Sequence, residues 1–343
     1  MTTLSFAESA GLAPDERNHV ASEEEPSPDV VRALHADAVS LNHSEWPVVV
    51  LMVVTALAAG IAATLFPQQL LYLWMCVVPL TLRVIVWGLQ GIRLRRSDPF
   101  EHYRRERRGE AEEAAGRADL QSRAAAKTPL ATLSLMIVIS AVGLLQLMSS
   151  GLEQAVAAAG LVKEAARAGE WWRLLTASYL HGNYYHYAGN MGGLILLGQM
   201  IEAYDRPLRV VLAYLCGVLG GGLLSVALLP GSSVGASGGV LGLAGYALVL
   251  FHRRPGDASR WLRGRVLGLL GATLVLGIVG FIFIDNAAHL GGVVTGLLLG
   301  AVAIPVGAIE LSPARTRILD VAGWIATAIL ASGAVFAMSR VVG

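Results

Sequence analysis

Charged residues and cysteines are scarce in this sequence. Only 15% of its 343 residues are charged, 55% are hydrophobic, and the mean hydropathy is +0.58. The only two cysteines, Cys76 and Cys216, both lie in apolar runs, which excludes a disulfide framework or a paired-cysteine metal site. The net charge of +1 argues against a nucleic-acid-binding domain. A composition this apolar indicates a membrane protein.

Long apolar runs fill most of the chain after residue 47. A helix needs about 20 predominantly apolar residues to cross a bilayer. The runs also lack the alternating polarity of β-barrel strands. We therefore predict an all-α polytopic membrane protein. The predicted spans are 47–66, 69–90, 129–149, 184–204, 208–229, 236–252, 264–284, 287–308 and 318–338.

Arginines between the spans predict the orientation of the chain. Seven arginines and three acids lie between Arg93 and Arg108, and five arginines and one acid lie between Arg253 and Arg265. The positive-inside rule places both segments in the cytoplasm. The N-terminus is then cytoplasmic, and the loops at 151–183, 230–235 and 285–286 face the external side. The arginine- and alanine-rich composition favours a bacterial inner membrane.

Composition divides the chain into five segments. Residues 1–46 are polar and acidic, which predicts a mostly disordered cytoplasmic tail, although 31–41 is compatible with a short amphipathic helix. A transmembrane hairpin at 47–92 and a basic cytoplasmic linker at 93–128 follow. Residues 129–310 form the predicted core, and 311–343 supply an additional C-terminal helix.

Polar residues gather at the predicted external ends of three core spans. Such groups are costly within a membrane and are therefore candidates for function. The orientation, inferred from arginines alone, brings all three clusters to one membrane level. They contain Trp172, Arg173, His181, His186 and Asn190; Gly235, Ser237 and Gly238; and His289, Gly292 and Gly296.

The clusters supply the groups required for acyl transfer. Ser237 and His289 suit a nucleophile and its general base. His186 and Asn190, four residues apart on one helix face, suit oxyanion donors, with the Ser237 backbone N–H at a helix start as a third. The small residues Gly238, Gly292 and Gly296 would allow the serine and histidine helices to approach closely.

These motifs strongly resemble the rhomboid family. Glu170-Trp171-Trp172-Arg173 with His181, His186 and Asn190 is similar to its Trp-Arg and HxxxxHxxxN motifs. Residues 235–238 are similar to its GxSG, and Ala288-His289 with Gly292 and Gly296 is similar to its AHxxGxxxG. The resemblance covers about residues 129–310.

The resemblance implies a six-helix catalytic core that cleaves single-span membrane proteins in or near their transmembrane segments. It implies Ser237 as nucleophile, His289 as base, and His186, Asn190, the Ser237 backbone and the Gly235 loop at the oxyanion. His181 would support the loop, and Trp172 and Arg173 would brace it. Many members have an aromatic residue one turn after the serine that packs on the imidazole; this sequence has Leu241 at that position.

Other interpretations fit the sequence less well. Residues 235–239 also satisfy the G-x-S-x-G elbow of soluble α/β-hydrolases, which requires a preceding strand. His181, His186 and Asp285 lack a recognised metal-ligand spacing, so no metal or cofactor is predicted, and Asp285 suits a helix cap. A non-catalytic rhomboid-like protein that binds transmembrane helices is the alternative function, and a transporter would require inverted repeats.

Overall fold

The computed structural model describes residues 26–44, 96–149, 151–280, 284–306 and 311–343, together with 89–90, 92 and 94. The chain divides into two compact units, Met1–Ala111 and Glu112–Gly343. The transmembrane hairpin predicted at 47–92 lies almost wholly outside the described residues. The predicted site lies in the second unit.

The described part of the first unit contains α3 (Pro28–Ser44) and the start of α6 (Pro99–Ala125). Helix α3 includes residues 31–41, the stretch of the tail that was compatible with a short amphipathic helix. Pro28 and Asp29 are favourable in a first helical turn. Val31 and Leu34 share one helix face and are only 2% and 8% exposed, so their burial explains why this segment is ordered.

Seven long helices of the second unit confirm the predicted all-α fold. Five of them in the described part, α7, α12, α14, α15 and α16, are long and apolar enough to cross a membrane. The chain is thus an integral multi-pass membrane protein. The seven are α7 (Leu130–Met148), α11 (Tyr184–Tyr204), α12 (Pro207–Leu228), α13 (Ser237–Arg253), α14 (Asp257–Val279), α15 (Asn286–Ala303) and α16 (Pro313–Val342).

Helices α14, α15 and α16 have boundaries that differ from the predicted spans by four residues or more; α16, for example, begins at Pro313 instead of residue 318. Helix α14 begins at Asp257, seven residues before the predicted span. Its first two turns are polar, so the predicted apolar run did not include them. Helix α15 ends at Ala303, five residues before the predicted end. Pro305 explains this end, since the residue before a proline is disfavoured in helical conformation.

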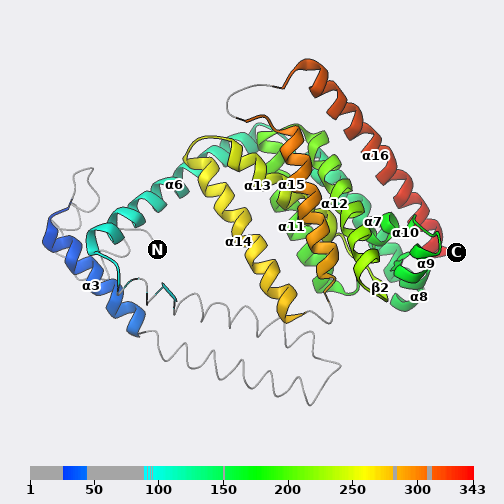
Figure 1. Ribbon diagram of the computed structural model, residues 1–343, viewed down its shortest axis with the longest axis horizontal. Coiled ribbons are helices and arrows are strands. Elements are labelled where there is room, and N and C mark those ends of the chain that lie inside the picture. The colour runs from blue at the N-terminus through cyan, green and yellow to red at the C-terminus, as the bar shows by residue number, and fades with distance from the viewer. Residues whose placement is uncertain are drawn as a thin grey trace, which may run out of the picture. The chain divides into compact units, whose positions relative to one another are not determined.

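Helices α12, α13 and α15 form the packed centre of the unit (Figure 1). In the most apolar 18-residue stretch of α12, 61% is buried inside the protein, whereas only 17% of the corresponding stretch is buried in the peripheral α14. Glycines bring the central backbones together: a Cβ on Gly217 would lie 2.8 Å from the Cα of Gly242, and one on Gly296 would overlap the Gly242 carbonyl. Close backbone approach of this kind is how membrane helices pack without a hydrophobic driving force between them.

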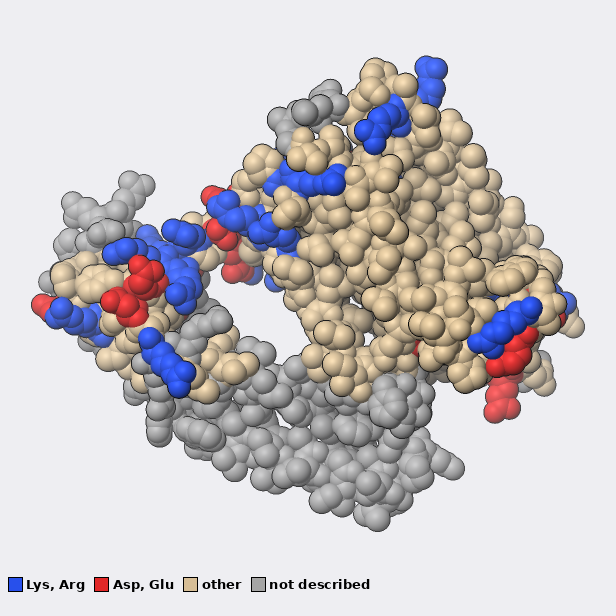
Figure 2. Space-filling view, in the orientation of Figure 1, with Lys and Arg blue, Asp and Glu red and all other residues tan. Residues whose placement is uncertain are grey.

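Arginines at the ends of the central helices satisfy free helix carbonyls. Arg254 Nη2 donates to Tyr204 O at 2.6 Å at the end of α11, and Arg253 Nη1 donates to Ala301 O at 2.8 Å near the end of α15. Cations at helix C-termini also interact favourably with the helix dipole. On the face shown in Figure 2, the surface between the two charged ends of this unit is almost entirely uncharged.

The segment between α7 and α11 forms a compact platform of short elements. They are α8 (Leu152–Ala159), β1 (Leu161–Val162), α9 (Lys163–Arg167), α10 (Arg173–Thr176) and the 3-10 helix η2 (Ala177–Tyr179). Strand β1 pairs antiparallel with β2 (Ser232–Ser233), with Leu161 opposite Ser233. The platform is thereby tied to the loop that precedes α13.

Helix α16, predicted as an additional helix, packs on the core from one end to the other. Buried Arg209 of α12 pairs with Asp320 at 3.1 Å. Further along, Tyr179 Oη donates to Leu330 O at 2.7 Å, and Phe336 meets the Trp172 ring edge-on at 5.1 Å. Its C-terminal half therefore supports the platform.

Candidate active site

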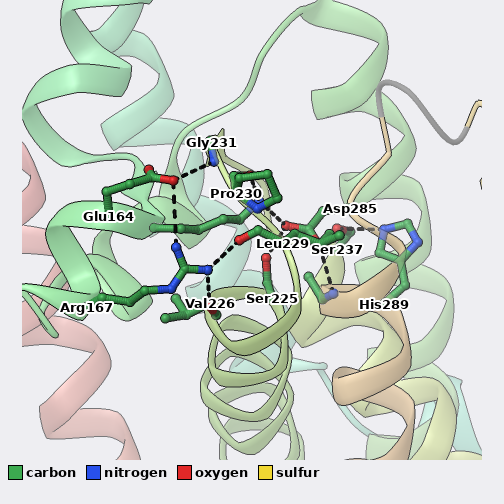
Figure 3. A network of polar contacts seen from close by, with 12 residues as sticks. Glu164, Arg167, Ser225, Val226, Leu229, Pro230, Gly231, Ser237, Asp285 and His289 are labelled. Carbon is green, nitrogen blue, oxygen red and sulfur yellow. Dashed lines mark hydrogen bonds and ion pairs between the residues drawn. The ribbon is translucent and has the colours of Figure 1, made fainter.

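The hydroxyl of Ser237 and the imidazole of His289 lie within hydrogen-bond distance. Ser237 Oγ is 3.0 Å from His289 Nε2, although 52 residues separate them in sequence. Ser237 is the first residue of α13, and His289 lies in the first turn of α15. Figure 3 shows the two side chains meeting between these helix starts. The predicted pair is therefore brought together.

Glycines set the distance between the two helices. A Cβ on Gly292, one turn after His289, would overlap the carbonyl oxygen of Gly238, the residue that follows Ser237. One turn further, a Cβ on Gly296 would overlap the Gly242 carbonyl. Gly238, Gly292 and Gly296 thus lie where the backbones of the two helices approach closely, and this spacing allows the short serine side chain to reach the imidazole.

His186 and Asn190 converge on the loop that leads into Ser237. A Cβ placed on Gly235 would lie 2.7 Å from His186 Nε2 and 3.4 Å from Asn190 Nδ2. The Asn190 amide nitrogen is buried, with no hydrogen-bond partner among the described residues. Two side-chain nitrogens therefore lie beside the loop that leads into the serine.

Helix α11 holds these two donors through an N-cap. Asn183 Oδ1 accepts the His186 N–H at 2.9 Å, which fixes the first turn of the helix. Asn183 was not among the predicted site residues, although an asparagine directly before the first residue of a helix is a known start signal.

Gly235 contributes by its conformation instead of by its amide. Its φ of 134° lies in the region that favours glycine, and a side chain there would overlap the His186 ring. Its N–H donates to Ala177 O at 2.9 Å, so the predicted contribution of this loop glycine to the oxyanion site is not made by its own N–H. The first turn of α13, which begins at Ser237, has backbone N–H groups without intrahelical acceptors.

A comparison with protein families matches residues 168–306 to the Rhomboid domain. This segment contains the serine–histidine pair, both side-chain donors and the packing glycines. This part of the chain is therefore similar to the Rhomboid domain. The resemblance noted in the sequence is thereby confirmed.

Individual proteins are similar to this chain over about two fifths of its length. RHOMBOID-like protein 6, mitochondrial, of Arabidopsis thaliana is 35% identical over 145 residues, which are 40% of this chain and 45% of that protein. RHOMBOID-like protein 4 of the same plant is 37% identical, over 41% of this chain and 36% of its own length. Rhomboid protease GluP of Bacillus subtilis (strain 168) is 33% identical, over 39% of this chain and 26% of its own length. The chain spans less than half the length of these relatives.

His181 of the rhomboid domain is a buried supporting residue. Its ring lies edge-on to His186 and Tyr187, with centroids 5.3 Å apart in each case. The Gln146 amide clamps its backbone, donating to His181 O at 2.8 Å and accepting its N–H at 3.0 Å. Burial, reinforced by the neighbouring His186, lowers the pKa of His181 to about 3. The residue is therefore a neutral packing element of the donor group.

Trp172 and Arg173 brace the platform of the rhomboid domain. Arg173 donates through Nη1 to Gly160 O at 2.8 Å and pairs through Nε with Glu170 at 2.6 Å. Its guanidinium lies 4.5 Å from the Trp172 ring centroid. Trp172 also packs on α16, an extension of this bracing that the motif alone did not predict.

A small cavity lies beside Ser237 in the rhomboid domain. Its volume is about 40 Å³, which is enough for water. The lining includes Ser178, Val218, Ser233, Ser237, Gly238 and Asp285. Water can therefore reside next to the serine, in a pocket with polar groups on part of its wall.

Proposed function

We propose that the chain is an intramembrane serine endopeptidase with a Ser237–His289 dyad. The observation that carries this proposal is the 3.0 Å contact between Ser237 Oγ and His289 Nε2 at the starts of two tightly packed helices. The name of one relative, Rhomboid protease GluP, supports the same chemistry.

Acylation uses the dyad directly. Ser237 Oγ attacks the carbonyl carbon of the scissile peptide while His289 Nε2 takes the hydroxyl proton. The carbonyl oxygen becomes an oxyanion, and the protonated imidazole then gives its proton to the leaving amine as the C–N bond breaks. The product amine departs and the substrate acyl group remains on Ser237.

Three donors would stabilise the developing oxyanion. They are the side chains of His186 and Asn190 and the backbone N–H of Ser237. Donors fixed before the reaction are worth about 2.7–4 kcal/mol each in comparable sites. In deacylation, a water oxygen attacks the acyl carbon while its proton passes to His289; the imidazolium then returns that proton to Ser237 Oγ as the acyl C–O bond breaks and the carboxylic acid product leaves. The cavity beside Ser237 is a suitable reservoir for this water.

The substrates we propose are membrane proteins that span the bilayer once. The dyad stands at the start of apolar helices, where an extended segment at the edge of a transmembrane helix would meet it. The arginine pattern favours an external active site and a cytoplasmic N-terminus, and we propose the bacterial inner membrane as the location.

A cleavage assay with the purified protein tests this function. Wild type, Ser237→Ala and His289→Ala are compared in liposomes on a fluorogenic substrate with a transmembrane segment, and a fluorophosphonate probe reports labelling of Ser237. We expect cleavage and labelling by wild type only, with all three proteins melting at similar temperatures. A folded wild type that neither cleaves several such substrates nor is labelled would favour the alternative, a non-catalytic protein that binds transmembrane helices.

A further inference from the structure

Among the residues that the structure describes, none bonds to the second imidazole nitrogen of His289. His289 Nδ1 is buried and makes no hydrogen bond with the described residues. In serine–histidine–aspartate sites a carboxylate on this nitrogen holds the ring. The position of the His289 ring must therefore depend on where its backbone lies, that is, on the first turn of α15.

Asp285 fixes that first turn. Its Oδ1 accepts the Ala288 N–H at 2.9 Å, and its backbone oxygen accepts the His289 N–H at 3.1 Å. An N-cap aspartate of this kind stabilises a helix start. Asp285 was predicted as a helix cap, and that prediction is confirmed.

The other carboxylate oxygen of Asp285 ties the helix start to two further elements. Oδ2 accepts a short hydrogen bond from Ser225 Oγ of α12 and lies 3.1 Å from Lys163 Nζ of α9. These contacts converge beside the dyad (Figure 3). Burial alone would raise the pKa of Asp285, but Ser225, the Ala288 amide and Lys163 together hold that pKa below its usual range.

Lys163 is buried in a way that is unusual for a lysine. Its side chain is 4% exposed, and its Nζ also donates to Pro230 O at 3.4 Å. The chain has only two lysines among its 26 basic residues, the other being the exposed Lys127. Burying an ammonium is costly unless it is paired, so this pair is tolerated only because Asp285 lies opposite.

The surroundings of Lys163 anchor it firmly. Its backbone N–H donates to Gly231 O at 3.0 Å, and Glu164 accepts the Gly231 N–H at 3.0 Å. Arg167 Nη2 donates to Leu229 O at 2.7 Å. The platform and the loop before Ser237 thus form one hydrogen-bonded assembly, from which Lys163 reaches the helix that carries His289.

We propose that Lys163 and Asp285 are positioning residues for the dyad, because their buried ion pair fixes the start of α15 and hence the imidazole of His289. This inference rests on the proposed protease function for its kinetic consequence. It assigns the platform a specific task, which is to hold the base against the serine. Neither residue touches the reacting atoms.

The test compares single and paired variants by kinetics in liposomes. Lys163→Met leaves the Asp285 carboxylate without its cation. Because a misplaced base slows the chemical step, we expect kcat to fall by about 10- to 100-fold with KM nearly unchanged. Lys163→Met combined with Asp285→Asn removes both charges and retains a capping side chain, so we expect kcat to recover at least several-fold. Lys127→Met is the matched control and should retain wild-type kcat.

Hydrogen exchange separates this inference from the proposed function. Amides of residues 285–292 should exchange at least several-fold faster in Lys163→Met than in wild type, and the double variant should reverse this, whether or not the protein cleaves peptides. If wild type is inactive but shows this exchange pattern, the proposed protease function is rejected, whereas the proposal that Lys163 and Asp285 fix the start of α15 is supported. Unchanged exchange in a folded Lys163→Met, or a kcat equal to that of wild type in an active preparation, would overturn the proposal.

Discussion

Gly292 of α15 lies directly against the carbonyl group of Gly238 in α13. A Cβ at position 292 would overlap that carbonyl oxygen, so the two backbones are too close for a side chain at this position. Ser237 directly precedes Gly238, and its 3.0 Å contact with His289 lies one turn before Gly292 in α15. The geometry of the dyad is therefore a property of backbone packing before it is a property of the two side chains.

Gly292→Ala is expected to separate the dyad. The added methyl group must push α15 away from α13, and overpacking of this kind costs about 1–3 kcal/mol. We expect cleavage to fall at least tenfold, together with a lower melting temperature. Gly271→Ala in α14 is the matched control, because a Cβ there has nothing within 4 Å. Wild-type cleavage by Gly292→Ala would show that the spacing of these helices does not limit catalysis.

Asn190→Ala is expected to lower kcat by about 100- to 1,000-fold, as for the loss of one oxyanion donor elsewhere. KM should change little, because the donor acts on charge that develops only in the transition state. The measurement is a Michaelis profile in liposomes. Tyr184→Phe in the same helix, at a side chain that is 76% exposed, should leave kcat unchanged. A change confined to KM would assign Asn190 to ground-state binding.

His181 is expected to make the protein sensitive to acid. Its pKa is about 3 in the folded protein, below the usual value of 6.5, so the unfolded chain binds more protons between these values. Its contribution to stability is present above pH 6.5 and is lost as pH falls toward 3, by at most about 1.4 kcal/mol per pH unit. His181→Phe cannot take up this proton.

Thermal unfolding between pH 7 and 4 measures that contribution. The melting temperature of wild type should fall more steeply with acidification than that of His181→Phe, while His252→Gln, at an exposed position, should follow wild type. Parallel curves for wild type and His181→Phe would mean that His181 is protonated as readily in the folded protein as in the unfolded chain.

Asp320→Asn is expected to loosen α16. Arg209 is 2% exposed, and removing its partner leaves a buried charge unpaired, at a cost of about 3 kcal/mol. Arg209 of α12 contacts α16 at Asp320, near the end opposite to the one that packs on Trp172. We therefore expect a lower melting temperature with little change in kcat. Arg317→Gln, exposed on the same helix, is the control. A melting temperature equal to that of wild type would show that Arg209 finds another partner or water.

Patterns within short stretches of sequence determined the fold of this protein. The apolar runs gave the helices of the second unit, and α11 begins and ends at the predicted residues 184 and 204. The spacing of His186 and Asn190, and of the glycines after Ser237 and His289, predicted which faces meet. In the tail, the sequence left a helix at 31–41 only as an alternative, because Val31 and Leu34 give a weak apolar stripe that is buried only in the folded unit.

The tertiary structure decided the polar contacts that link distant segments. Lys163 and Asp285 are far apart in sequence, as are Arg209 and Asp320, and neither pair has a local signature. Which carboxylate a buried cation meets depends on how loops fold over helix ends, and many pairings have similar energies until desolvation removes the unpaired ones. The sequence alone therefore specified the helices and the reactive groups, whereas packing decided what holds those groups in place.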